Sequence, residues 1–111
     1  MGLFDTFRSA RRAESPVAAD RRHLYEWAAQ HIGVEAYVEP RTNVTPLTVV
    51  LVADDGEWTR RPIDGAAGAR RLGEGLGIPV YDVQKVGYPQ RMRDYDARRR
   101  IERRRQRDLE N

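Results

Sequence analysis

The sequence predicts an α+β fold: a small two-layer domain in which two helices pack on a mixed sheet of three or four strands, with an extended arginine-rich helix at the carboxyl end. Three observations predict this fold. A run of β-branched apolar residues at 47–53 leads into an Asp-Gly turn, apolar residues recur at helical spacing on both sides of that hairpin, and the closing segment is charged almost throughout. Strands grouped between helices are typical of this class.

The first helix is expected over residues 15–33. Ser15 is placed to cap it, Pro16 suits the first helical position, and Gly33 suits a left-handed residue at its end. Apolar side chains at helical spacing are expected to face the core; they are Val17, Leu24, Trp27, Ala28 and Ile32.

Three strands should follow. Residues 34–39 alternate, with Val34, Ala36 and Val38 on the core side and Tyr37 on the other side. Residues 47–53 read as a buried central strand, because their apolar run is continuous. An Asp55-Gly56 turn then closes a hairpin, and Pro62 ends the last strand or places it at an edge, because proline cannot donate to a sheet.

A second helix is expected to open at Asp64, with Ala69, Leu72 and Leu76 facing inward, although five glycines at residues 65–77 weaken it. Residues 78–86 are expected to form a fourth strand, and the closing helix should start near Pro89. Met92 and Tyr95 should join the core. The side chains expected to be mostly buried are Leu24, Trp27, Val49, Leu51, Leu72 and Val83.

Composition limits the classes of protein that fit. A chain of 111 residues suits one domain. It has no cysteine, which excludes disulfides and thiolate chemistry, and no apolar run long enough for a membrane span or a secretory signal, so we expect a cytoplasmic protein. Lys85 is its single lysine beside 19 arginines, a bias that indicates GC-rich coding and a bacterial source.

Charge is unevenly distributed along the chain. We divide it into a basic amphipathic arm (1–14), a compact domain (15–95) and an arginine-rich helical extension (96–111). Residues 23–90 carry six basic and nine acidic side chains, whereas residues 91–111 carry nine arginines and five acids. Such asymmetry indicates an interaction made by the basic ends.

The extension is expected to bind a polyanion, either structured RNA such as ribosomal RNA or DNA, because guanidinium groups match phosphate. The expected binding residues are Arg98, Arg99, Arg100, Arg103, Arg104, Arg105 and Arg107. Pairs at helical spacing should support this helix; they are Asp94–Arg98, Asp96–Arg100, Glu102–Arg105 and Arg104–Asp108.

Two alternatives remain for the charged ends. The protein could be an adaptor whose closing helix docks on an acidic protein through Ile101 and Leu109, or the helix could be a solvated tail. At the other end, Leu3, Phe4 and Phe7 share one helical face, which suits contact with a membrane surface or docking on the domain.

The third alternative is a small enzyme of unidentified chemistry. It ranks last because the sequence suggests no catalytic, cofactor or metal site. His23 and His31 are eight residues apart, whereas helical metal ligands favour a spacing of four. Asp54, Asp55 and Glu57 are explained by the hairpin turn without a metal. Any small-molecule cleft is expected beside a group of four side chains: Tyr81, Asp82, Lys85 and Tyr88.

Overall fold

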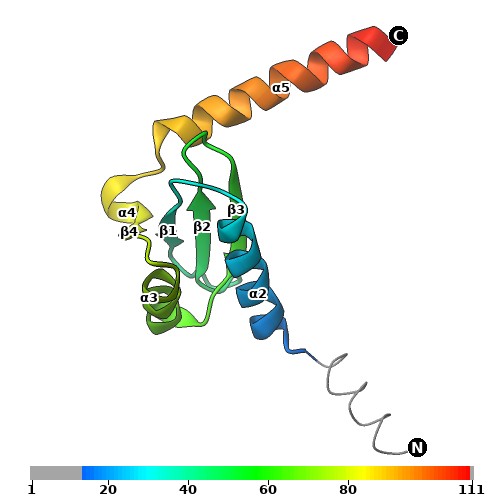
Figure 1. Cartoon of the computed structure of the whole chain (residues 1–111). Helices are drawn as coiled ribbons and strands as arrows, with labels where there is room; N and C mark the ends of the chain where they lie inside the picture. The colour runs from blue at the N-terminus through cyan, green and yellow to red at the C-terminus, as the bar shows by residue number, and fades with distance from the viewer. Residues whose placement is uncertain (1–13, 111) are drawn as a thin grey trace, which may run out of the picture.

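The computed structural model describes residues 14–110 and confirms the α+β class (Figure 1). Its elements in chain order are α2 (Pro16–Ala29), β1 (Glu35–Glu39), β2 (Thr48–Val52), β3 (Trp58–Pro62), α3 (Gly65–Leu76), β4 (Val80–Asp82), α4 (Val83–Val86) and α5 (Gln90–Glu110). Leu3, Phe4 and Phe7, expected to form an amphipathic face, lie outside the described residues.

The four strands form one mixed sheet in the order β3-β2-β1-β4. β1, β2 and β3 are antiparallel neighbours, so the expected hairpin is confirmed, with Leu51 opposite Thr59. β3 is an edge strand that ends at Pro62, as expected from the missing amide donor of proline. β4 is parallel to β1 at the edge of the sheet opposite β3.

Helices α2 and α3 cover one face of the sheet and enclose the main core. This core consists of Leu24, Val34, Ala36, Val49, Leu51 and Leu72. The glycines of α3 permit close packing, because a Cβ atom on Gly73 would lie 2.3 Å from Val80 Cγ2. Part of the glycine content that weakens α3 in isolation is therefore required by its contact with β4.

The opposite face of the sheet is also packed, which the alternating pattern of residues 34–39 did not predict. Tyr37 was expected on the solvent side, yet it is only 6% exposed and clusters with Val50, Val52 and Met92. Tyr88 packs against the same cluster. The segment entering α5 therefore covers a face that sequence periodicity alone assigns to water.

The end of the first helix differs from the prediction. Ser15 caps α2 by accepting a hydrogen bond from the Ala18 amide at 3.1 Å, as expected, but the helix ends at Ala29. The chain leaves the helical path at residues 30–31 through tighter backbone bonds, so Ile32 is 73% exposed. Trp27, expected to be mostly buried, is half-buried and packs against the main core.

The predicted strand at residues 78–86 is too long. β4 covers only Val80–Asp82, and Val83–Val86 form the short helix α4. Asp82 causes this change, because its carboxylate accepts a hydrogen bond from the Gln84 amide at 2.9 Å and caps the helix. Val83 is consequently half-buried instead of buried in a strand.

Candidate nucleic-acid interface

The first turns of α5 are fixed to the sheet by polar contacts as well as by buried Met92. The Arg91 guanidinium forms an ion pair with Glu35 at 2.6 Å and donates to the Ala53 carbonyl at 2.8 Å. One turn later, the Trp58 indole donates to the Asp96 carboxylate at 2.8 Å. These contacts with β1, β3 and the residue that follows β2 determine the direction in which α5 leaves the domain.

Gly56 in the hairpin turn makes this packing possible. Its φ of +93° lies in a region that L-residues rarely adopt, and an added Cβ atom would lie 2.0 Å from the Arg91 carbonyl oxygen. The turn that the sequence predicts from Asp55-Gly56 is therefore also the surface on which α5 rests.

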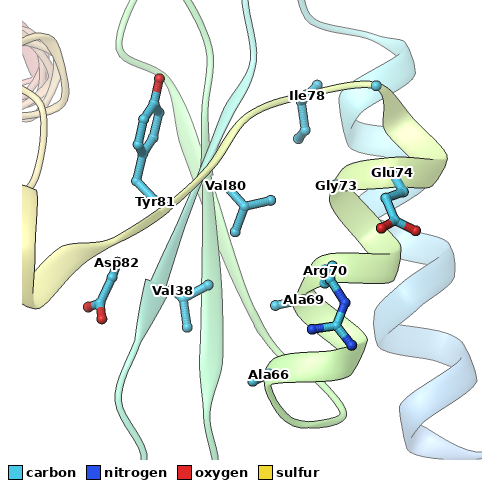
Figure 2. A pocket seen from close by; sticks show the side chains of 11 residues that line it. Val38, Ala66, Ala69, Arg70, Gly73, Glu74, Ile78, Val80, Tyr81 and Asp82 are labelled. Carbon is cyan, nitrogen blue, oxygen red and sulfur yellow. The ribbon is translucent and has the colours of Figure 1, made fainter.

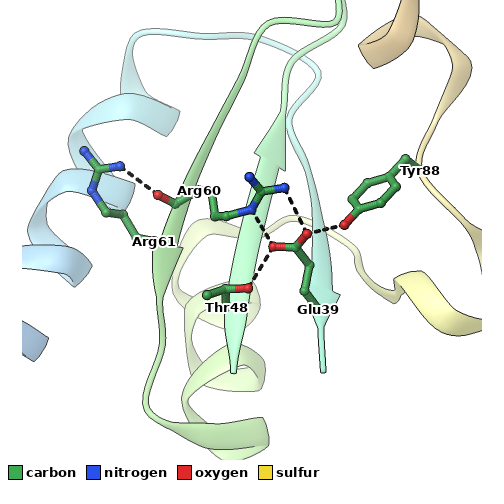
Figure 3. Close-up of polar contacts among 5 residues, drawn as sticks. All are labelled: Glu39, Thr48, Arg60, Arg61 and Tyr88. Carbon is green, nitrogen blue, oxygen red and sulfur yellow. Dashed lines mark hydrogen bonds and ion pairs between the residues drawn. The ribbon is translucent and has the colours of Figure 1, made fainter. Parts of the chain in front are cut away.

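A second polar cluster holds the segment before α5 (Figure 3). The Glu39 carboxylate accepts two hydrogen bonds from Arg60, at 2.6 and 3.0 Å, one from the Thr48 hydroxyl at 2.7 Å, and one from the Tyr88 hydroxyl. Burial favours the neutral acid, but these donors outweigh burial and lower the pKa of Glu39. Burial, followed by contact with Glu39, raises the pKa of Tyr88. The cluster is saturated with internal partners and serves to position Tyr88.

Residues 98–110, here called the outer part of α5, are exposed without exception. All seven arginines expected to bind phosphate are therefore on the surface of one straight helix that projects from the domain (Figure 1). Arg98 donates to the Asp55 carbonyl at 2.9 Å, which links the base of this segment to the hairpin.

The expected ion pairs along α5 are not those that form. Arg99 pairs with Glu102 at 3.4 Å, and none of the four predicted pairs is present in residues 14–110. Asp96 is engaged by Trp58, and Asp94 accepts a hydrogen bond from Gln90 at 3.1 Å. Of the seven arginines in the outer part of α5, four have neither a salt bridge nor a side-chain hydrogen bond within residues 14–110: Arg100, Arg104, Arg105 and Arg107.

A groove of about 590 Å³ lies between α3 and the β4 edge (Figure 2). Its floor is apolar, and Arg70, Glu74 and Asp82 lie along it. Of the four side chains expected around a cleft, Tyr81 and Asp82 line this groove, whereas Lys85 does not and Tyr88 is held by Glu39. The groove therefore lies beside two of these four side chains.

The two histidines make separate structural contacts. His23 Nε2 lies 2.8 Å from the Thr59 hydroxyl, while His31 stacks on Trp27 with ring centroids 3.7 Å apart. The turn containing Asp55 is closed by its carboxylate, which accepts from the Glu57 amide at 2.9 Å. Across residues 14–110, His, Asp and Glu side chains form no cluster of three or more suited to a metal ion.

His31 links the end of α2 to the hairpin and should make stability depend on pH. Its Nδ1 lies 2.6 Å from the Trp27 carbonyl oxygen and its Nε2 lies 2.9 Å from the Glu57 carboxylate, so only the doubly protonated ring donates to both. Burial opposes the charge, but these two acceptors outweigh burial and raise the pKa of His31.

We expect His31→Gln to lower the free energy of unfolding more at about pH 5.5 than at about pH 8.5. A group whose pKa is raised in the folded state stabilises the protein fully at pH values below the ordinary histidine pKa. This contribution disappears as the pH rises through the pKa of the folded state. Urea denaturation of both proteins at the two pH values measures the difference. An equal loss at both values would contradict a charged His31.

The contacts that position α5 could not be found from local sequence patterns. Arg91 binds Glu35, which lies 56 positions earlier in the chain, and Trp58 binds Asp96, which lies 38 positions later. Glu39 and Arg91 look like ordinary surface charges in the sequence. The seven arginines, in contrast, are conspicuous because they are adjacent.

Comparison with family models, curated proteins and solved structures finds no significant match to this chain. Among the described residues, no helix has the length and apolar character needed to span a membrane.

Proposed function

We propose that this is a non-enzymatic, cytoplasmic accessory protein whose outer part of α5 binds a polyanion, either structured RNA such as ribosomal RNA or DNA. One observation carries the proposal: seven arginines project from the domain on the fully exposed outer part of α5, and six of them have no ionic partner within residues 14–110. A helix built only for solubility would not need so strong an excess of one sign.

Charge repulsion supplies the physical reason for a polyanionic ligand. Like charges three or four residues apart destabilise a helix, and Glu102 is the one acid inside the arginine run. Phosphate groups relieve this repulsion, and the planar guanidinium group binds phosphate through two parallel hydrogen bonds. Because the first turns of α5 are anchored to the sheet, the helix that carries these arginines is already formed before a ligand binds.

An acidic protein is a weaker candidate partner, because the exposed apolar residues of the outer part do not form a stripe. Ile101 is 47% and Leu109 is 84% exposed, and they are eight positions apart with charged residues between them. Helices that dock through an apolar face place anchors three, four and seven residues apart.

Binding should weaken steeply with salt. If Arg100, Arg104 and Arg107 each contact one phosphate of a duplex, the slope of log K against log salt should be about −2.7 or steeper, because each contact contributes about −0.9. Titrations of fluorescently labelled RNA and DNA with the full chain, over a salt series, measure this slope.

Unrelated sequences should bind with similar affinity, because phosphate contacts carry little sequence information. Absence of binding to both RNA and DNA at low salt would overturn the proposal. In that case, capture of an acidic protein that depends on the same arginines would favour the adaptor function.

A further inference from the structure

The arginines of the outer part of α5 are arranged on three sides of the helix. Successive residues of an α-helix are rotated by about 100°. The pairs Arg98/Arg105, Arg99/Arg103 and Arg100/Arg104 therefore define three rows that are about 100 to 130° apart. A ligand that lies flat against one side of the helix can contact one or two of these rows.

A groove would contact all three rows. The major groove of B-form DNA is about 12 Å wide and about 8.5 Å deep, and it accepts an α-helix of about 10 to 12 Å diameter. Phosphates line both of its walls, and guanine presents acceptors for arginine on its floor. The major groove of an A-form RNA duplex is too narrow for the same approach.

The fold leaves this helix free to enter such a groove. The outer part of α5 contains 13 residues, all exposed, and is therefore about 20 Å long. The contacts of Arg91, Met92 and Asp96 with the sheet hold only the preceding turns. Figure 1 shows the helix projecting past the sheet, at the end of the domain away from the first turns of α2.

We propose that the outer part of α5 binds in the major groove of B-form duplex DNA, with two arginine rows on the phosphate walls and the third toward the base edges. This inference rests on the proposed function and selects one ligand from it. The two wall rows contain four arginines, so the salt slope on DNA should be about −3.6 or steeper when each contacts one phosphate.

The test compares a DNA duplex of about two helical turns with the RNA duplex of the same sequence. Full-length protein should bind the DNA duplex at least about tenfold more tightly, because the helix cannot enter the A-form major groove. Three double variants each remove one row: Arg98→Gln with Arg105→Gln, Arg99→Gln with Arg103→Gln, and Arg100→Gln with Arg104→Gln.

Each double variant should weaken DNA binding about tenfold or more and make the salt slope shallower, by up to about 1.8 where both arginines contact phosphate. Because Arg98 also bonds to the hairpin, Arg105→Gln alone serves as a second variant for that row, and thermal melting confirms that each variant is folded. Equal affinity for both duplexes, or dependence on one row alone, would overturn groove binding and leave the proposed function standing. No binding to either duplex would overturn both.

Discussion

Replacing Leu51 by alanine should lower the free energy of unfolding by about 2 to 5 kcal/mol. Leu51 lies in the central strand β2, has no exposed surface and packs in one cluster with Leu24 and Leu72. Its truncation would leave a cavity between the sheet and both helices. Small domains have only about 5 to 15 kcal/mol of stability in total, so the variant should be close to unfolding.

Urea denaturation followed by tryptophan fluorescence measures this loss, since Trp27 and Trp58 are both half-buried. Leu109→Ala is the matched control, because Leu109 is 84% exposed on the outer part of α5 and its loss should change stability by less than about 0.5 kcal/mol. Equal denaturation midpoints for the two variants would show that the core has been assigned to the wrong residues.

Reversing Arg100, Arg104 and Arg107 to glutamate should abolish nucleic-acid binding while leaving the fold intact. Each charge-assisted contact contributes about 1.5 to 3 kcal/mol, so loss of three contacts should reduce affinity by about a thousandfold or more. The introduced carboxylates would also repel phosphate. Stability should change little, because all three side chains are exposed and make no polar contact within residues 14–110.

A charge-matched control separates a local contact from a general effect of net charge. Arg21, Arg41 and Arg70 are exposed, form no salt bridge in the described part of the chain and lie outside α5. Their reversal to glutamate changes the net charge by the same amount. Binding by this control should remain close to that of the unmodified protein.

The elements that local chemistry determines were predictable from the sequence. The Asp55-Gly56 turn, the Ser15 cap and the apolar run of β2 each specify their own structure within a few residues. The predicted limits of the fourth strand were wrong, because Asp82 caps a helix inside a segment whose sequence is typical of a continuous strand. Tyr37 does lie on the face opposite Val34 and Ala36, as predicted, but that face is buried, because its cover comes from Met92 and Tyr88, more than 50 residues along the chain.

The candidate interface was likewise predictable only in part. Its seven arginines can be read from the sequence, whereas their separation from the domain depends on how Arg91 and Asp96 hold the first turns of α5. Helical spacing predicted ion pairs for Asp94 and Asp96, but their carboxylates are occupied by Gln90 and Trp58. One contact within α5 and one tertiary contact thereby leave more of the arginines available than the sequence alone indicates.

The most direct measurement is a fluorescence anisotropy titration of one labelled DNA duplex and one labelled structured RNA, at low salt, with three proteins: the unmodified chain, the α5 triple reversal and the charge-matched control. The account predicts that the unmodified chain and the control bind at least one of these nucleic acids, and that the α5 variant binds neither. Binding by the α5 variant as tight as that of the unmodified chain would contradict it.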